Sequence, residues 1–345
     1  MEQKEDVVLQ AEADVTIPSA AERDDAEQFA AGQSGRAASE KKPKKVSWKK
    51  DIMQNWQVYT LFIPAFVFFL LMCYVPMFGI VMAFEDFRIV DGIFGSEWVW
   101  FDNFIELFTA EKFWQVLGNT VVIALLKITI QFIAPIIFAL LLSLLRSKKY
   151  KRTVQTLSYM PNFVAAVVIC SLFTSFFGLN GVISTWLTGQ GSDWIINDQV
   201  PVFWLMYTFM GIWQGIGWGS IMYVASISMV NGDLHEAAAL DGATRLQRLW
   251  YITLPCIMPM IMMMLVMNVG LSFTTGFDNI LLLYAPKNFN VADTLYTYTY
   301  RLAFDAGNQD YALSAASGLF QSVVGTILLV GSNKLSKKLS GSSLF

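Results

Sequence analysis

Six long apolar stretches stand out in the succession of hydrophobic and polar residues along this 345-residue chain. A helix needs about 20 apolar residues to cross a bilayer, and each stretch reaches that length. Pro64, Pro76, Pro135 and Pro161 fall within or near these stretches, where neighbouring helices must satisfy the carbonyl groups that a proline frees. The pattern therefore predicts an all-α integral membrane protein with six packed transmembrane helices. They are expected at about 59–84, 116–145, 154–178, 202–230, 256–284 and 312–335.

The polar N-terminal segment has a different character. Its first forty residues are rich in Ala, Glu, Gln and Ser and contain almost no aromatic residues. Such a composition cannot bury a core, so we expect disorder. The stretch "KKPKKVSWKK" (41–50) then adds a basic end, and no apolar run before Tyr59 suggests a cleavable signal peptide. The sequence predicts a disordered, basic-ended tail at 1–50 and a six-span membrane region at 51–345.

Lysine and arginine gather on one side of this topology. The tail holds nine of them, the loop 146–152 holds five, the loop after the fourth span holds two, and the C-terminal segment holds three. The three loops on the other side hold four in all, and Lys127 lies inside the second span. Loops rich in Lys and Arg remain on the cytoplasmic side. Both the N and the C terminus are therefore expected in the cytoplasm.

The composition agrees with a membrane protein and argues against other classes. The chain is 55% hydrophobic and 15% charged, whereas soluble domains carry about 25% charged residues. A formal net charge of −3 gives no support for nucleic-acid binding. Cys73, Cys170 and Cys256 match no metal-site or disulfide spacing and are expected to be small buried hydrophobes. The methionine-rich stretch 256–268 is expected to pack in the core, and no metal site is predicted.

One long cytoplasmic loop carries the stretch "EAAALDGATRLQRLWYITLP" (236–255), which predicts two short helices with a sharp joint. Asp233 is expected to cap the first helix, with Glu236 three residues later capping that same helix. Gly242 permits a left-handed turn or a close backbone approach at the joint. Thr244 and Gln247 repeat the capping-box spacing and start the second helix.

The second helix of this loop has its own pattern. Leu246, Leu249 and Trp250 recur at i, i+3 and i+4 and are expected to form one apolar stripe. Pro255 is expected to close the element and open the fifth span. Such an element can lie in a groove of a partner protein. It can equally rest on the lipid headgroups, where arginine and tryptophan are also suited. The residues alone leave both interpretations open.

The same loop resembles the cytoplasmic signature of type I, binding-protein-dependent ABC importer permeases, Glu-Ala-Ala-x3-Gly-x9-Ile-x-Leu-Pro. The chain keeps every spacing of that signature with Glu236-Ala237-Ala238, Gly242, Ile252, Leu254 and Pro255. Asp241-Gly242-Ala243 is similar to the sugar-importing branch. Three further segments resemble permeases that import oligosaccharides released from polysaccharides in Gram-positive bacteria: 74–87, 113–127 and 154–169.

The resemblance implies a permease subunit of an ATP-driven importer in a bacterial, Gram-positive cell membrane. It implies the type I ABC importer permease fold, a core at about 113–335 and a coupling loop at 231–255. The solute would be a carbohydrate, and an oligosaccharide in this branch. The expected partners are a second homologous permease forming a heterodimer, two ATPase subunits holding ATP and Mg, and an extracellular lipid-anchored substrate-binding protein.

The chain itself is not expected to be an enzyme. No Gly-Lys dipeptide occurs, so a Walker A phosphate loop is absent from the sequence. No other catalytic constellation is recognisable, and no cofactor is expected in this chain. The resemblance instead assigns ATPase coupling to a helix at about 234–250. The residues expected to carry it are Leu234, Glu236, Ala237, Ala238, Asp241, Gly242, Arg245, Leu246, Arg248 and Pro255.

The substrate pathway is predicted from polar and aromatic residues inside spans. Aromatic rings stack on the apolar faces of sugars, and amides bind hydroxyl groups. Unpaired polar groups are costly in hydrocarbon, so they should face protein or water. Lys127 either snorkels, pairs with a partner, or lines the pathway, and small residues at 211, 215 and 219 favour close helix packing. The pathway candidates are Trp213, Gln214, Trp218, Asn268, Asp278, Asn279 and Gln321.

Three alternative functions compete with the importer. An ion-coupled secondary transporter would need acids at the bilayer midplane and two repeated halves, but Lys127 is the clear midspan charge and no repeat is visible. A membrane scaffold or sensor would explain a docking helix but not the full signature. An ABC permease for a non-sugar solute stays open. The outer loop 85–115, with Trp98, Trp100 and Phe101, suits either interfacial anchoring or docking of the binding protein.

Overall fold

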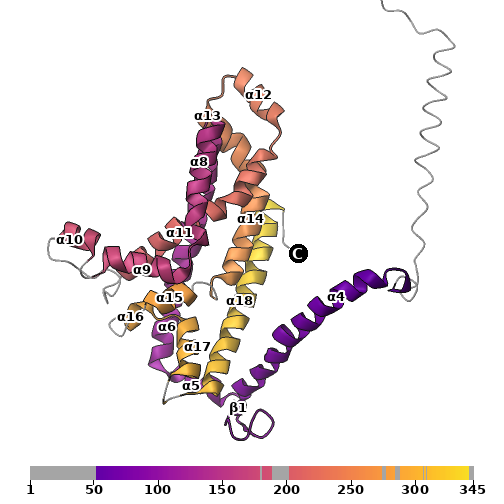
Figure 1. Ribbon diagram of the computed structural model, residues 1–345, viewed down its shortest axis with the longest axis vertical. Coiled ribbons are helices and arrows are strands. Elements are labelled where there is room, and N and C mark those ends of the chain that lie inside the picture. Colours follow the sequence, from indigo (N-terminus) through magenta and orange to yellow (C-terminus); the bar gives the residue numbers. More distant parts are fainter. Residues whose placement is uncertain are drawn as a thin grey trace, which may run out of the picture. The chain divides into compact units, whose positions relative to one another are not determined.

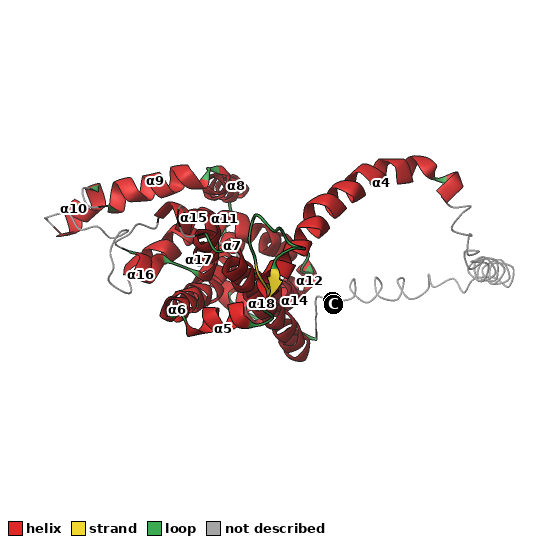
Figure 2. Cartoon of the chain, turned by 90° about the horizontal axis from the view of Figure 1, so that it is seen from below, coloured by secondary structure: helices red, strands yellow, loops and turns green. Residues whose placement is uncertain are grey.

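The structure is a computed structural model, and it describes residues 52–178, 181–188, 202–273, 277–283, 288–305, 307 and 309–341. The predicted tail 1–50 lies outside the described residues. The described chain is almost entirely helical, and a single small antiparallel sheet pairs β1 (Glu85–Asp86) with β2 (Glu97–Trp98) within it (Figure 2). The chain divides into two compact units, residues 1–75 and 76–345.

The first unit contributes α4 (Trp56–Phe69) and the π-helix η1 (Leu70–Tyr74). No residue of either helix is buried. Along the chain, the helical segment continues through the 3-10 helix η2 (Val75–Phe84). The whole run Trp56–Phe84 is long and apolar enough to cross a membrane, as predicted for the first span.

Four helical runs of the described residues are long and apolar enough to cross a membrane. They agree with the first, second, fifth and sixth predicted spans. A fifth is reached if α8 (Lys148–Tyr159) with η4 (Met160–Phe163) and α9 (Ala166–Phe177) form one span bent by 99°. This pair replaces the straight third span that the sequence predicted. The four runs are Trp56–Phe84, Glu111–Leu144, Arg245–Leu271 and Tyr311–Lys338.

The predicted fourth span corresponds to α11 (Val202–Ser228), which has 27 residues. It is long enough to cross a bilayer, but it is not among the runs that are also sufficiently apolar. Its glycines, tryptophans, tyrosines, serines and glutamine explain the difference. The six-span count therefore stays a prediction. The predicted fifth span, 256–284, ends earlier than expected, because α14 (Leu254–Leu271) stops before the separate helix α15 (Phe277–Leu283).

Three of the long runs contain a π-helix shortly before a proline, and in Trp56–Phe84 it is η1, which ends two residues before Pro76. In Glu111–Leu144, the π-helix η3 (Lys127–Gln131) joins α6 (Glu111–Leu126) to α7 (Phe132–Leu144), which contains Pro135. A proline clashes with the carbonyl four residues earlier and cannot donate to it. That carbonyl belongs to Gln131, inside the wider π-turn, so the helix continues through the proline without a break.

The helix α11 lies at the centre of the second unit. It packs against α7, η3, α8, η4 and α14, while α18 (Tyr311–Ser340) packs against α14, α17 (Leu295–Phe304) and α5 (Asp102–Thr109) (Figure 1). Small residues bring α11 close to its neighbours. A Cβ added at Gly211 would lie 2.4 Å from the Gln131 amide, and one at Gly219 would lie 3.1 Å from Pro135. The predicted close packing of these two glycines is confirmed.

The tightest approach involves Gly217, which the predicted glycine spacing did not include. A Cβ there would lie 2.0 Å from the Ser158 carbonyl oxygen of α8, whereas one at Gly215 would meet no atom within 4 Å. Gly217→Ala is therefore expected to destabilise the protein by about 1–3 kcal/mol through overpacking. Gly215→Ala should be neutral or stabilising, since alanine favours a helix by up to about 1 kcal/mol. Apparent melting temperatures in detergent test this, and equal shifts would refute the packing argument.

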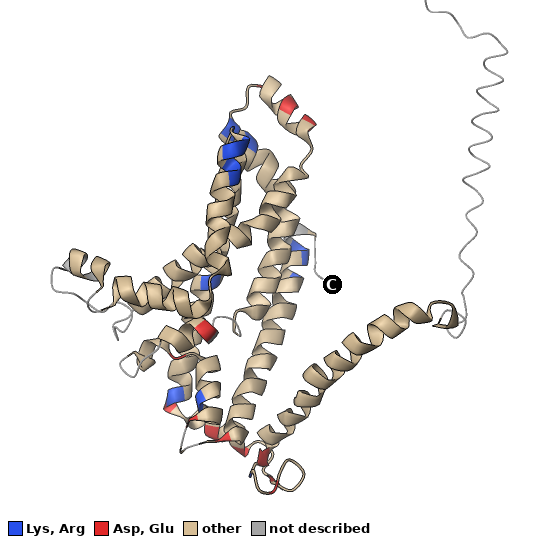
Figure 3. Ribbon diagram, viewed as in Figure 1, with Lys and Arg blue, Asp and Glu red and all other residues tan. Residues whose placement is uncertain are grey.

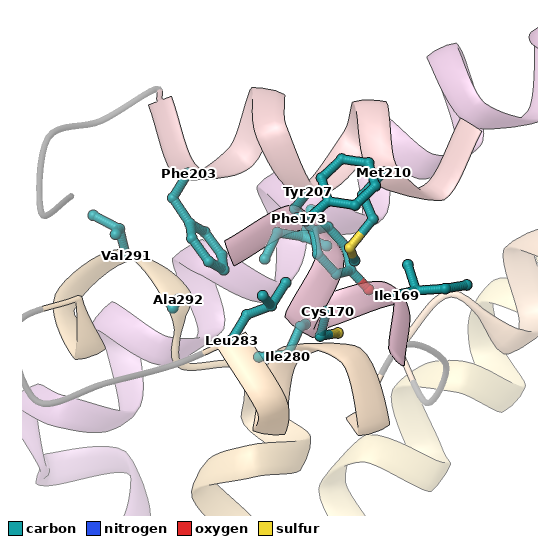
Figure 4. Close-up of a cluster of buried hydrophobic side chains, with 11 residues drawn as sticks. Ile169, Cys170, Phe173, Phe203, Tyr207, Met210, Ile280, Leu283, Val291 and Ala292 are labelled. Carbon is teal, nitrogen blue, oxygen red and sulfur yellow. The ribbon is translucent and has the colours of Figure 1, made fainter. Parts of the chain in front are cut away.

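A buried cluster holds α9, α11, α15 and α16 (Phe289–Ala292) together (Figure 4). Phe173 of α9 packs among Tyr207 and Met210 of α11 and Ile280 of α15. Cys170 is buried in the same cluster, as predicted, but Cys73 and Cys256 are exposed. The prediction of burial is wrong for these two, because their helices present those faces to the outside of the chain.

The methionine-rich stretch packs only partly in the core. Met262 is buried, and Met260 and Met264 pack against a second cluster between α7, α11 and α14. Met258 and Met263 are exposed on the surface of the chain. A straight helix can bury only one face, so the expected core role holds for that face alone.

A buried polar network secures α16 and α17. The Asp293 carboxylate is fully buried, accepts from the Thr297 hydroxyl at 2.7 Å and is ion-paired with Arg301, which also lies 4.8 Å over the Phe289 ring. Asn119 of α6 donates to the Asp293 carbonyl oxygen at 3.0 Å. Burial raises the pKa of Asp293 above its ordinary value, and the Arg301 charge opposes that shift.

Candidate functional site

The helix α12 (Gly232–Leu240) is the first half of the predicted coupling element. Its N-cap is Asn231, whose side chain accepts from the Asp233 backbone N–H at 3.0 Å. The prediction that Asp233 caps this helix is therefore wrong, because the helix begins one residue before it. Glu236 forms no hydrogen bond or ion pair with the residues that the structure describes, so its predicted capping role is also wrong. Its carboxylate stays exposed on the surface of α12.

The joint after α12 is a Schellman turn centred on Gly242. The backbone N–H of Ala243 donates to the Ala238 carbonyl oxygen at 2.9 Å, and that of Gly242 donates to the Ala239 carbonyl oxygen at 3.2 Å. Gly242 has a φ of 82°, which confirms the predicted left-handed turn. No atom lies within 4 Å of where its Cβ would be. Within this chain, the requirement for glycine therefore comes from the backbone conformation.

The second half begins as predicted. Thr244 and Gln247 form a capping box, with the Thr244 N–H donating to the Gln247 amide oxygen at 2.7 Å. The helix α13 (Arg245–Arg248) then continues through the π-helix η5 (Leu249–Thr253) into α14. Pro255 does not close this element, because the carbonyl four residues earlier belongs to the wider π-turn. The second half of the coupling element and the predicted fifth span form one continuous helix.

The three residues of the predicted apolar stripe, Leu246, Leu249 and Trp250, do not point in one direction. Leu249 is buried against α7 and α11, whereas Leu246 and Trp250 are 60% and 59% exposed. The change to π-helical geometry at Leu249 alters the residue spacing, which explains why the three side chains do not share one face. Leu249 anchors the element, and the other two remain available to a partner.

The helix α12 projects from the rest of the second unit (Figure 1). None of its residues is buried, and Leu240 is 90% exposed. The Arg248 guanidinium donates from Nη1 to the His235 carbonyl oxygen at 3.1 Å and ties α12 to α13. Leu240 was not among the predicted functional residues, because an Ala-Leu run indicates helix formation without showing which face is left open.

A cavity of about 380 Å³ lies under this element. Arg146, Arg245 and Arg248 line it together with His235 and apolar residues from the ends of α7 and α11. Figure 3 shows most of the basic residues at this end of the unit, where α12 itself carries acidic residues, and most of the acidic residues around α5 and β1 at the other end. A basic end is typical of the cytoplasmic side of a membrane.

A second cavity, of about 330 Å³, lies between η3, α7, α11 and α14. It contains two of the predicted pathway residues, Trp218 and Asn268, together with Lys127. Trp218 is 50% exposed and packs edge-on against Phe163, with ring centroids 5.6 Å apart. Asn268 donates from Nδ2 to the Met264 carbonyl oxygen at 2.9 Å. Residues far apart in the sequence thus converge on one cavity.

The other predicted pathway residues lie elsewhere. Asn279 donates to the Gln214 amide oxygen at 3.4 Å, so these two form a separate pair between α15 and α11. Trp213 packs on Phe173, with ring centroids 5.8 Å apart. Asp278 is exposed.

Gln321 has a different environment. It is 2% exposed and donates from Nε2 to the Leu295 carbonyl oxygen at 3.2 Å and to the Thr299 hydroxyl at 2.9 Å. These bonds link α18 to α17 and occupy the amide N–H groups inside the protein. The geometry gives Gln321 a structural contact, and a contact with sugar stays a prediction.

Comparison with known proteins points to membrane transport. The profile of the family described as binding-protein-dependent transport system inner membrane component matches residues 135–340. Protein LplB of Bacillus subtilis (strain 168) is 37% identical over 306 residues, which cover 88% of this chain and 95% of that protein. The polygalacturonan/rhamnogalacturonan transport system permease protein YteP of the same strain is 37% identical over 309 residues, covering 88% and 95%.

Two solved chains share the fold. One comes from a bacterial ABC transporter involved in the import of the acidic polysaccharide alginate, with a TM-score of 0.77 and 34% identity over 84% of this chain and 98% of that chain. The other comes from a bacterial alginate ABC transporter in complex with an alginate pentasaccharide-bound periplasmic protein. It has a TM-score of 0.77 and 33% identity over 86% of this chain and 99% of that chain.

Proposed function

Since the chain belongs to the family of binding-protein-dependent transport system inner membrane components, we propose that it is the permease subunit of an ATP-driven carbohydrate importer. The solute class follows from relatives that are named as permeases or importers for polysaccharides. Within this class we propose an oligosaccharide, because a binding protein would deliver short sugar chains released from a polysaccharide to such a permease.

The observation that carries the mechanism is the projecting helix α12. A nine-residue helix without a single buried residue gains no stability from packing within its own chain. Its exposed Leu240 and Leu234 and its unpaired Glu236 suit a groove on another protein. We infer that this groove belongs to a separate ATPase subunit, since this chain lacks a phosphate-binding loop.

The continuous helix from α13 to α14 explains how docking could move the pathway. A rigid helix transmits a tilt at its cytoplasmic end along its whole length. Arg248 ties α12 to this helix through the His235 carbonyl oxygen, and Leu249 anchors it to α7 and α11. When two ATPase subunits close on ATP and Mg, the α13–α14 helix would tilt against α11 and open the pathway outward. The coupling is reciprocal, so substrate arrival should stimulate ATP hydrolysis.

The remaining partners are part of the same proposal. A second homologous permease would complete the pathway as a heterodimer, and an extracellular lipid-anchored binding protein would deliver the sugar. The chain would lie in the cell membrane of a Gram-positive bacterium. Reconstitution with the proteins encoded beside it tests the function: ATP-dependent uptake of an oligosaccharide into proteoliposomes supports it, and uptake that persists without nucleotide refutes it.

Leu240→Asp tests docking directly. Replacing an apolar side chain that becomes buried in a partner by a charged one typically weakens binding by about 2 kcal/mol or more. Recovery of the ATPase with the tagged permease is therefore expected to fall by about tenfold or more. Val90→Asp is the matched control, because Val90 is 96% exposed and lies in the loop between β1 and β2, whereas β1 is far from α12 (Figure 1). Unchanged ATPase recovery with Leu240→Asp would instead favour α12 lying on the lipid headgroups.

A further inference from the structure

Lys127 is the charged residue of the 330 Å³ cavity between η3, α7, α11 and α14. No aspartate or glutamate lines this cavity. Its ammonium group forms no hydrogen bond or ion pair with any residue that the structure describes. A lysine without a counter-ion is costly in a membrane-spanning helix and usually marks a functional path.

Snorkelling does not explain this position. Lys127 lies near the middle of the run Glu111–Leu144. A helix rises 1.5 Å per residue, so roughly 24 Å of helix separate Lys127 from either end. Since the hydrocarbon core is about 30 Å thick, a residue near the middle of a spanning run lies about 15 Å from either headgroup region, beyond the reach of a lysine side chain. The cation therefore has to be compensated inside the transporter.

The backbone around Lys127 departs from regular α-helical geometry. The π-helix η3 begins at this residue, and π-turns occur frequently at functional sites. Glycines on the facing helix α11 leave the space that forms the cavity, since Gly215 has no atom within 4 Å of where a Cβ would be. The cavity is thus a built feature of the fold, with Lys127 on one wall and the glycines of α11 on the facing wall.

The rest of the lining suits a sugar. Trp218 offers a half-exposed ring for the apolar face of a pyranose. The amides of Gln131 and Asn268 each donate to a backbone carbonyl oxygen, of Thr208 and Met264, so each amide oxygen remains as an acceptor for a hydroxyl group. A neutral sugar would satisfy these groups and leave the lysine uncompensated.

We propose that this cavity binds an acidic oligosaccharide during transport, with the Lys127 ammonium paired to the carboxylate of a uronate residue. The inference rests on the proposed function and adds the charge of the substrate to it. Charge-assisted hydrogen bonds between lysine and a carboxylate are strongest where water is excluded. The pair would hold the sugar while the pathway changes its direction of opening.

The test uses the complete transporter in proteoliposomes, with the binding protein encoded beside it. Galacturonate and alginate trimers are compared with their methyl esters, which have the same rings but no charge. Calorimetry first measures the affinity of the binding protein for each trimer, so that losses at the permease are separated from losses in delivery. The variants are Lys127→Gln, Lys127→Arg and, as the control, Lys112→Gln, because Lys112 is a partly buried lysine of the same helical run that lies outside the cavity and donates to the Gln115 amide oxygen at 3.2 Å.

Lys127→Gln should reduce uptake of the uronate trimer by about tenfold to a hundredfold and leave uptake of its ester at the wild-type level. Lys127→Arg should retain most uronate uptake, and Lys112→Gln should match wild type. Three results would overturn the proposal: a binding protein that takes only neutral trimers, equal losses for uronate and ester, or normal uronate uptake by Lys127→Gln. Equal losses would indicate an ion pair with the second permease. Absence of any ATP-dependent uptake by the wild type would count against the proposed function instead.

Discussion

Replacing Gly242 by valine should reduce both ATP-driven uptake and substrate-stimulated ATP hydrolysis at least about tenfold. Gly242 has a φ of 82°, a conformation in which a β-branched side chain is a severe outlier. The left-handed conformation costs an ordinary L-residue about 1–2 kcal/mol. The joint should therefore adopt another conformation and present α12 at a different angle to the ATPase. Since α12 has no buried residue, the membrane-embedded part should still fold.

Two further variants separate the causes of this loss. Gly341→Val has the same type of backbone cost, because Gly341 has a φ of 68° with open space around it at the end of α18. It should leave uptake near the wild-type level. Gly242→Asn adds volume but tolerates the left-handed conformation. If Gly242→Asn is as inactive as Gly242→Val, the ATPase packs closely on Gly242. Normal coupling in Gly242→Val would refute the role of the joint.

Local chemistry made most of the joint predictable. Thr244 and Gln247 are three residues apart, and a capping box depends only on that spacing and on a helix start. Gly242 is similarly local, since few other residues close a Schellman turn. Asp233 failed as a cap because Asn231, two residues earlier, is an equally good N-cap and takes the position. Two candidates so close in sequence cannot be ranked by propensity alone.

The sequence predicts that the long helices exist, but it does not predict where they bend or continue through a proline. Apolar length identifies a span, yet it does not show that a π-turn carries a helix through Pro135 or Pro255. Nor does it reveal the 99° bend between η4 and α9. The hydropathy criterion does not identify α11 as a span, because its glycines and polar residues make contacts with neighbouring helices. Hydropathy measures preference for lipid, and a central helix need not satisfy it.

Contacts between residues far apart in the sequence were the hardest features to predict. Gln321 was predicted as a pathway residue from its polarity in an apolar run, whereas its amide holds α17 through Leu295 and Thr299. Lys127 and Asn268 are far apart in the chain, and only the fold shows that they share a cavity. A polar residue in a span must have a partner or a function. The sequence does not distinguish between these two outcomes.

Asp293→Ala is expected to lower the free energy of unfolding by about 3–5 kcal/mol, because it leaves the Arg301 cation without its partner in a mostly buried site. The Asp293 side chain is fully buried, and that of Arg301 is 23% exposed. The loss should loosen α16 and α17, which this pair connects along with Thr297. Denaturant titration of the detergent-solubilised protein measures the change.

The control and a milder variant locate the source of that loss. Asp305→Ala removes an exposed acid from the C-terminal end of α17, where a negative charge opposes the helix dipole, so it should be neutral or slightly stabilising. Asp293→Asn keeps the shape and one acceptor for Thr297 but removes the charge. It should lie between wild type and Asp293→Ala if the hydrogen bond to Thr297 and the packing contribute alongside the ion pair. Equal losses in both Asp293 variants would assign the energy to the ion pair alone, whereas a loss below about 1 kcal/mol, typical of an exposed pair, would show that water reaches the site.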